Sequence, residues 1–175
     1  MEIFTIGHST HPLDEFVGML KHNGIRRLID IRSVPRSRHN PQFEQAELIR
    51  SLPAQGIEYI HLKALGGLRP KRKHSINTAW RNDSFRNYAD YMQTEDFEEG
   101  LRQLIALAQE MSTAIMCAEV LPWRCHRSLV ADALLARGIK VMDIMSQTST
   151  TPHSMTPFAV VDQGRVSYPG EETHG

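Results

Sequence analysis

The chain has 175 residues, of which 41% are hydrophobic and 23% are charged, and its formal net charge at pH 7 is zero. These values predict one globular domain, 1–175, with its core in about 2–145 and a partly irregular tail in 146–175. The neutral charge excludes a polycation, so binding to nucleic acid would need a local basic patch. No apolar run approaches the length of a membrane helix, so no membrane partner is expected.

The N-terminal residues 1–10 lack the basic start and the long apolar stretch of a signal peptide. The chain has two cysteines, and without an export signal they are expected to remain reduced thiols. The sequence therefore predicts a cytoplasmic protein without a structural disulfide.

Strand and helix patterns alternate along the chain. Short apolar runs predict strands at 3–9, 26–33, 57–67, 113–119 and 139–145. Apolar residues at helical spacing predict helices at 11–24, about 42–52, 85–93, 95–111 and 125–138. Residues 158–170 resemble a hairpin with its turn near Gln163-Gly164. Together these elements predict an α/β fold: a mostly parallel open sheet of about five strands, helices on both faces and a C-terminal hairpin.

Polar and reactive side chains follow the carboxyl end of each of the first four expected strands. In an open parallel sheet, ligands bind in a crevice at that edge. The residues expected to contact substrate there are Ser9, Arg32, Arg36, Ser37, Gly66, Gly67, Cys117, Cys125, His126 and Arg127. Those expected to act in catalysis are His8, Asp30 and Glu119. The opposite edge receives three similar helix-exit turns, a pattern that favours a purely structural role for that edge.

Five short motifs, taken in order, resemble a known family. They are TIGHS at 5–9, DIRSVPRSR at 30–38, LGG at 65–67, CAE at 117–119 and CHR at 125–127. As a set, over about 2–145, they resemble the domain of unknown function 488 family. The signature positions that match are His8, Ser9, Asp30, Arg32, Pro35, Cys117, Glu119, Cys125, His126 and Arg127. The resemblance implies a prokaryotic cytoplasmic protein with one α/β domain, and it implies no particular reaction.

Both cysteines lie within one short stretch, for which three interpretations compete. A zinc site would need three or four ligands, which Cys117, Cys125 and His126 could supply together with His8 or Glu119. The paired spacings typical of such sites are absent, so no cofactor is predicted and a zinc ion is kept as a minority alternative. A redox pair lacks its usual Cys-x-x-Cys spacing as well. We therefore expect the cysteines to be packing and helix-entry positions.

The third interpretation makes the same stretch one wall of an anion-binding active site. Cys125 stands near a helix N-terminus, where backbone N–H groups and the helix dipole favour anions. Arg124 and Arg127 add positive charge to this turn. Glu119 leaves an apolar strand and is expected to be partly desolvated, with a pKa raised toward the range useful in acid–base chemistry. A salt bridge to a nearby arginine is the alternative for Glu119.

Three further features have both a structural and a functional interpretation. Asp30 interrupts an apolar strand and is expected to pair with Arg32 on the same face, either for stability or to position substrate. His8 either hydrogen bonds locally or acts as an acid–base group or ligand contact. The Gly66-Gly67 pair either turns the chain or allows close approach of a ligand to the backbone.

Two basic segments, 35–39 and 69–74, are expected to open on the same edge, with Trp80 nearby. Arginine, lysine and an aromatic residue are typical of contacts with phosphate or nucleic acid, although a solvated loop has the same composition. The sequence therefore favours an enzyme, a hydrolase or transferase, acting on a phosphate-bearing small molecule such as a nucleotide or a nucleic-acid component. The alternative is a non-catalytic module that binds nucleic acid or a partner through these loops.

Overall fold

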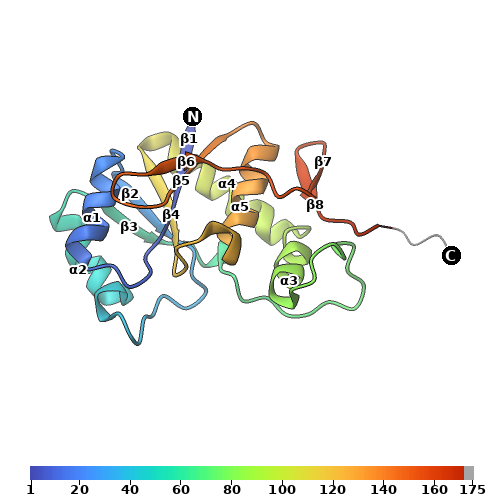
Figure 1. Cartoon of the computed structure of the whole chain (residues 1–175), viewed down its shortest axis with the longest axis horizontal. Coiled ribbons are helices and arrows are strands. Elements are labelled where there is room, and N and C mark those ends of the chain that lie inside the picture. Colours follow the sequence, from blue (N-terminus) through green and yellow to red (C-terminus); the bar gives the residue numbers. More distant parts are fainter. Residues whose placement is uncertain (172–175) are drawn as a thin grey trace.

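The computed structural model describes residues 1–171, which form a six-stranded sheet covered by helices (Figure 1). Its strands are β1 Glu2–Gly7, β2 Arg27–Asp30, β3 Glu58–His61, β4 Thr113–Cys117, β5 Lys140–Ile144 and β6 Thr150–Pro152. Their order across the sheet is β3-β2-β4-β1-β5-β6. Strands β1 to β5 are parallel, and β6 pairs antiparallel with β5. The predicted mostly parallel sheet is confirmed, whereas residues 172–175 of the expected tail lie outside the described residues.

All of the predicted helices are present. They are α1 Leu13–His22, α2 Gln45–Ala54, α3 Asp83–Tyr91, α4 Glu95–Glu110 and α5 Arg127–Ala136. Short 3-10 helices form at η1 Pro41–Phe43, η2 Lys63–Leu65 and η3 Pro122–Arg124. Asn82 caps α3 and Thr94 caps α4, because each side-chain oxygen accepts a hydrogen bond from a backbone N–H in the first turn. None of the helices within residues 1–171 is long and apolar enough to cross a membrane.

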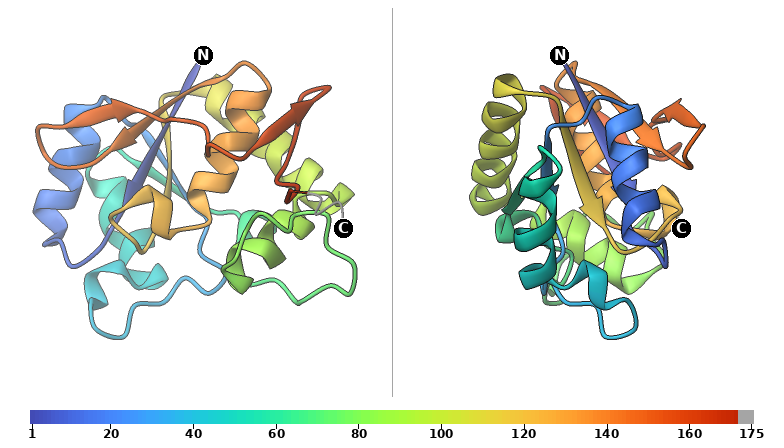
Figure 2. Two further views of the ribbon diagram at one scale, coloured as in Figure 1. Left: turned by 45° about the vertical axis from the view of Figure 1, so that its right-hand side comes forward. Right: turned by 90° about the vertical axis from the view of Figure 1, so that its left-hand side faces the viewer.

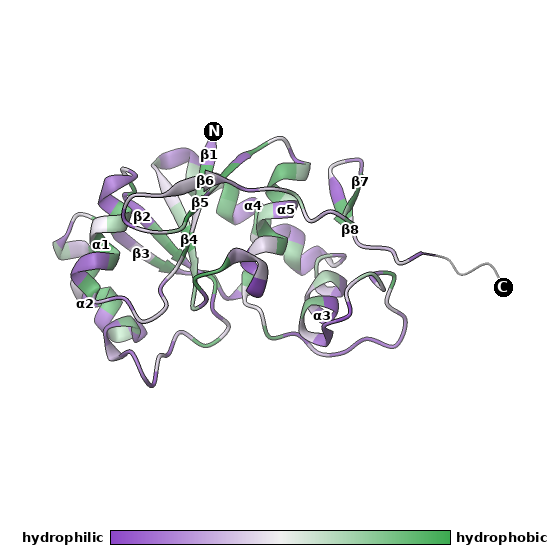
Figure 3. Cartoon of the chain, in the orientation of Figure 1, coloured by the Kyte–Doolittle hydropathy of each residue, from purple (hydrophilic) through white to green (hydrophobic). Residues whose placement is uncertain are grey.

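The helices cover both faces of the sheet, as the sequence predicts. Alternate residues of a strand point to opposite faces, so each central strand contributes to two separate cores. One core joins the sheet to α3, α4 and α5, and its strand residues include Ile3, Ile29, Ile115 and Val141. The other joins it to α1 and α2, and its strand residues include Phe4, Leu28, Ala114 and Met116. Figure 2 shows α1 and α4 on opposite sides of the sheet, and Figure 3 shows that the strands between them are hydrophobic.

The tail is more ordered than the sequence indicates. Strand β6 lies within the segment expected to be a partly irregular tail, and it extends the main sheet through pairing with β5. The predicted hairpin is confirmed as β7 Val160–Asp162 and β8 Arg165–Ser167. Its turn residues, Gln163 and Gly164, have φ of 51° and 77°, the positive values that two-residue hairpin turns require.

The order of the strands creates a switch point between β1 and β4. From β1 the chain passes along α1 to β2, on one side of the β1–β4 pair. From β4 it passes along α5 to β5, on the other side, and α5 packs in the opposite core from α1. The two loops therefore diverge at the carboxyl ends of neighbouring strands, and this is where open α/β sheets bind ligands.

Candidate functional site

The crevice at this switch point consists of two adjoining hollows, of about 380 Å³ and about 600 Å³. Arg36, Ala118 and Glu119 line both hollows, so the two form one continuous site. The predicted site residues that line it are His8, Ser9, Arg32, Arg36, Ser37, Gly67, Cys117, Glu119, Cys125 and His126. The other three predicted residues line neither hollow and lie behind the residues that do: Asp30, Gly66 and Arg127.

Arg32 is held in the crevice wall by Asp30, which confirms the predicted pair. The Asp30 carboxylate is fully buried and accepts hydrogen bonds from Nη2 and Nε of Arg32 at 2.7 Å and 2.9 Å. It also accepts from the Arg32 backbone N–H at 3.0 Å and from the Tyr59 hydroxyl at 2.6 Å. Asp30 therefore has no free oxygen facing a ligand, and its place in the site is to position the Arg32 guanidinium.

His8 is a neutral histidine in the floor of the larger hollow. Its ring stacks on Phe43 with centroids 4.4 Å apart, and only 3% of the residue is exposed. Nδ1 lies 2.8 Å from the carbonyl oxygen of Ser9, and Nε2 lies 3.4 Å from Nη1 of Arg32. Burial, together with the charge of Arg32, lowers the pKa of His8 to about 4. At neutral pH, Nδ1 thus donates to Ser9 and Nε2 presents a lone pair.

Glu119 is exposed, so the expectation that it would be partly desolvated is wrong. Its backbone carbonyl, rather than its side chain, faces the interior and accepts a hydrogen bond from Arg127 Nη1 at 2.6 Å. Within residues 1–171 the carboxylate forms no ion pair, and the alternative of a salt bridge to a neighbouring arginine is therefore also not observed. The side chain stands where the two hollows meet.

Arg127 is a completely buried cation that supports the loop after β4. Its Nη1 and Nη2 donate to the carbonyl oxygens of Glu119 and Val120 at 2.6 Å and 2.7 Å. Nη1 also lies 3.2 Å from Sγ of Cys117. Because these contacts occupy the guanidinium inside the protein, Arg127 shapes the crevice from below.

Both cysteines are free and buried, consistent with the packing positions predicted for them. Sγ of Cys125 accepts a hydrogen bond from the backbone N–H of Arg127 at 3.5 Å. Burial raises the pKa of the Cys125 thiol. Burial opposes ionisation of Cys117 too, but the adjacent Cys125 thiol and the charge of Arg127 outweigh it and lower the pKa of Cys117.

His126 and the glycine pair close the opposite wall by tight packing. Nε2 of His126 donates to the carbonyl oxygen of Ile31 at 2.8 Å, and burial lowers the pKa of this histidine to about 4. A Cβ at Gly67 would lie 2.6 Å from Nδ1 of His126, and one at Gly66 would lie 2.6 Å from Oγ of Ser33. The two glycines are thus required for close approach within the protein.

The rim of the crevice carries the remaining predicted residues. Ser9 has a φ of 46° and donates its backbone N–H to the carbonyl of Ala118 at 2.8 Å, which ties the loops after β1 and β4 together. Ser37 donates its backbone N–H to Oε1 of Glu44 at 2.9 Å. Arg36 is exposed and lines both hollows. Arg124, which the sequence analysis considered only as added charge, is exposed at the edge of the smaller hollow.

Within residues 1–171, no group of three or more His, Cys, Asp or Glu side chains is arranged to hold a metal ion. The two candidate ligands nearest in sequence, Cys125 and His126, contact each other, with Sγ 3.4 Å from Nδ1. The remaining nitrogen of His126 is committed to Ile31.

The basic segment 69–74 divides into two parts. Arg69 is structural, because it donates to the carbonyl oxygens of Lys63, Ala64 and Gly66 and its guanidinium lies 3.6 Å from the Tyr91 ring centroid. Lys71, Arg72, Lys73 and His74 are all exposed. Any contact of this segment with a partner therefore depends on its exposed second part.

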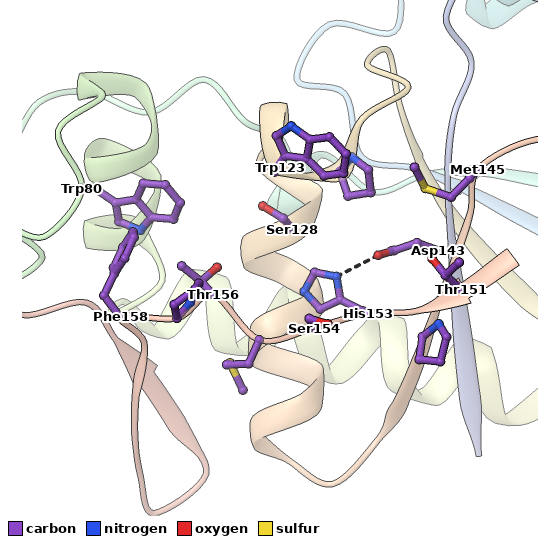
Figure 4. A pocket seen from close by; sticks show the side chains of 14 residues that line it. Trp80, Trp123, Ser128, Asp143, Met145, Thr151, His153, Ser154, Thr156 and Phe158 are labelled. Carbon is purple, nitrogen blue, oxygen red and sulfur yellow. Dashed lines mark hydrogen bonds and ion pairs between the residues drawn. The ribbon is translucent and has the colours of Figure 1, made fainter.

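A second pocket, which the sequence analysis missed, lies on the other side of η3 (Figure 4). It has a volume of about 460 Å³, and its walls include Trp80, Trp123 and Phe158. His153 lies in it between two carboxylates, with Nδ1 3.0 Å from Asp143 and Nε2 3.0 Å from Asp132. Asp143 interrupts the apolar residues of β5 as Asp30 interrupts those of β2. An acid in an apolar strand indicates a buried partner, and this pattern can be seen in the sequence alone.

The fold and the crevice define a class of open α/β protein with a polar site at its topological switch point. The chain belongs to the family described as domain of unknown function DUF488, whose model matches residues 12–134. This match confirms the family that the sequence motifs indicate. Comparisons with curated proteins and with solved structures gave no match.

Proposed function

We propose that the crevice binds a phosphate-bearing ligand, a nucleotide or a nucleic-acid component, and that the protein is a hydrolase or transferase acting on it. The observation that carries the proposal is the charge of the walls. Arg32, Arg36 and Arg124 line the smaller hollow, and Glu119 is the one carboxylate among its lining residues. Within residues 1–171, neither Arg36 nor Arg124 has an ion-pair partner. Such unpaired arginines are suited to a multivalent anion.

The arginines differ in how they would contact the ligand. Arg32 is 6% exposed and fixed by Asp30. Its Nη1 lies 3.4 Å from both Nε2 of His8 and the carbonyl oxygen of Arg36, and a ligand oxygen would replace these long contacts. Arg36 and Arg124 are exposed and can adjust to the ligand. A phosphate between them would exchange hydration for charge-assisted hydrogen bonds from opposite walls.

Two side chains beside these arginines would take part in the reaction. Nε2 of His8 is an unprotonated nitrogen at neutral pH, and a water molecule or a substrate hydroxyl that donates to it would replace its long 3.4 Å contact with Nη1 of Arg32. The free carboxylate of Glu119 stands at the junction of the hollows and would take a proton or attack an electrophilic carbon. A carboxylate and a histidine beside an arginine cluster support hydrolysis or group transfer.

Binding is tested by calorimetric titration with inorganic phosphate and with nucleoside monophosphates at low salt. We expect the double variant R36Q/R124Q to bind at least tenfold more weakly. Arg26 precedes β2 at the opposite edge of the sheet and is also exposed, so R26Q is a matched control that should bind normally. Equal affinities in the double variant and the wild type would overturn the phosphate site.

Catalysis is tested separately, with nucleotides whose hydrolysis is followed as release of phosphate or of free base. We expect E119Q to lose turnover while it keeps ligand affinity and thermal stability, because the Glu119 side chain is exposed and its carboxylate forms no ion pair within residues 1–171. Turnover at the wild-type rate in E119Q would exclude the catalytic role. Tight binding without turnover of any member of the panel by the wild type would exclude an enzyme of this class.

The exposed cations of the loop before α3 support a second candidate, a module that binds nucleic acid. Lys71, Arg72 and Lys73 are consecutive and exposed, so together they would contact a phosphate backbone. This function predicts salt-sensitive binding of single-stranded RNA or DNA in a mobility-shift assay. Neutralising these three residues should weaken it, whereas R36Q/R124Q should leave it unchanged.

A further inference from the structure

The pocket behind η3 is walled by apolar and aromatic side chains from three separate segments (Figure 4). Trp80 comes from the loop before α3, Trp123 from η3, and Phe158 from the segment between β6 and β7. Met145 and Met155 also belong to this lining. A volume of about 460 Å³ lies within the range of pockets that enclose small molecules.

One side of the pocket carries a buried cluster of charges. The side chain of His153 is 5% exposed, and both its ring nitrogens are held at 3.0 Å from carboxylate oxygens of Asp132 and Asp143. The two carboxylates also accept hydrogen bonds from the hydroxyls of Tyr168 and Thr5, which carry no charge. A protonated His153 between two carboxylates leaves the cluster with a net charge of −1.

This cluster makes the pocket unsuited to anions. Asp143 and His153 are the only charged residues among those that line it, and the imidazolium has no N–H left to donate to a ligand. The crevice on the other side of η3 has the opposite character, because its lining contains three arginines. The same 3-10 helix separates the two: Pro122 and Trp123 face the pocket, whereas Arg124 and the following Cys125 face the crevice.

We propose that this pocket binds a small organic cation whose charged nitrogen carries apolar substituents, such as a quaternary ammonium group. Aromatic faces attract such cations through the ring quadrupole, and the apolar substituents avoid the large desolvation cost of a compact ammonium ion. Methionine side chains adapt to the shape of the ligand. The negative cluster adds an attraction that a neutral ligand of the same shape would not receive.

The pocket is fixed in place before any ligand arrives. His153 connects β5 and α5 to the segment that carries Phe158, and the backbone N–H of Thr156 donates to Asp132 at 3.1 Å. The rings of Trp80 and Phe158 pack edge to face with centroids 4.8 Å apart. A wall held by such contacts loses little conformational entropy when it binds a ligand.

The two tryptophans of the chain both line this pocket, so intrinsic fluorescence reports on it directly. Choline is the cationic probe, and 3,3-dimethylbutan-1-ol is its neutral isostere with carbon in place of the charged nitrogen. We expect a saturable fluorescence change with choline at millimolar concentration. The neutral alcohol should bind about two- to thirtyfold more weakly, the range that a cation–π contribution of about 0.5–2 kcal/mol gives.

A variant of Phe158 tests whether choline binds in this pocket. F158L keeps an apolar side chain but removes an aromatic face, and should weaken choline binding several-fold while thermal unfolding stays close to that of the wild type. Val161 lies in the same tail, is exposed and does not line the pocket, so V161A is the matched control with unchanged binding. Equal binding of choline and its neutral isostere, no saturable response to choline, or wild-type affinity in a folded F158L would each overturn the proposal.

Discussion

The guanidinium of Arg32 in the crevice wall and the carboxylate of Asp30 behind it form a buried, two-point ion pair, with side chains that are 6% and 0% exposed. Asp30 is the last residue of β2 and Arg32 follows two residues later, so the pair forms within one short stretch of chain. Tyr59 on β3 completes it by donating to Asp30 at 2.6 Å. Arg32 therefore connects the packing at the end of β2 to the lining of the crevice.

Replacing Asp30 by Asn should be strongly destabilising. The change leaves the buried Arg32 without its counter-charge, which costs about 3–5 kcal/mol when one partner of a buried pair is removed. Urea unfolding followed by circular dichroism measures the loss. Y59F removes one hydrogen bond to the same carboxylate and should cost only about 1 kcal/mol. If D30N were no less stable than Y59F, the ion pair would not be a major support of this edge.

Gly7 allows the loop after β4 to cross closely over the end of β1. A Cβ at this position would lie 1.6 Å from the carbonyl oxygen of Glu119 and 2.6 Å from Nη1 of Arg127. G7A must therefore displace the loop or the strand, and we expect it to lower the free energy of unfolding by several kcal/mol and to weaken phosphate binding.

Gly18 provides the control for this substitution. It lies in α1, and a Cβ added there would meet nothing within 4 Å. G18A should be neutral or should stabilise the protein by about 0.5–1 kcal/mol, because alanine favours the helix. Chemical unfolding of the two variants side by side measures the contrast. A stable G7A with normal ligand affinity would show that the loop does not depend on this contact.

The sequence predicts the sheet well because its strands are short apolar runs whose carboxyl ends share an edge. It also predicts the Asp30–Arg32 pair, since a lone acid in an apolar strand needs a nearby partner. The exposure of the Glu119 side chain could not be predicted from such a local sequence pattern. It depends on the loop path, which Gly7 and the buried Arg127 determine together through contacts distant in sequence.

The second pocket was missed for a related reason. Its charged cluster combines Asp132 from α5, Asp143 from β5 and His153 from the tail, and no motif spacing connects them. Asp143 and Asp132 each interrupt an apolar stretch, which indicates a buried partner without identifying it. Only packing of the tail against α5 brings the histidine to them.

The two buried histidines of the crevice should make the protein sensitive to acid. The pKa values of His8 and His126 are lowered to about 4, because burial disfavours their charged forms. Unfolding returns each to its ordinary pKa of 6.5, so the unfolded state binds more protons between pH 6.5 and 4. The stability that each neutral ring contributes is present above pH 6.5 and is lost as the pH falls through 4. The loss of unfolding free energy from each histidine reaches about 2 kcal/mol at pH 5.

The free energy of unfolding, measured with urea at pH 7 and at pH 5, tests this predicted loss of stability. H8Q should lose less stability than the wild type between the two values, because one titrating group has been removed. The exposed His74 supplies the control, and H74Q should keep the wild-type loss. An H8Q variant with the same pH dependence as H74Q would show that His8 titrates normally in the folded protein.

His153 should have the opposite effect at alkaline pH. Burial disfavours its charge, but the hydrogen bonds that the ring donates to Asp132 and Asp143, together with the negative charges of these carboxylates, prevail and raise the pKa of His153 to about 9. Since the folded value exceeds the ordinary 6.5, the folded state binds more protons between these limits. The stabilisation is complete below pH 6.5 and is lost as the pH rises through 9, a change on the order of 3 kcal/mol.

The measurement is the urea unfolding free energy of the wild type and of H153Q at pH 6 and pH 10. The wild type should lose stability across this interval, and H153Q should be less stable at pH 6 and nearly insensitive to the change. H74Q again serves as the control, because the side chain of His74 is exposed. If H153Q and the wild type lost the same stability between pH 6 and pH 10, His153 would not be the group that titrates.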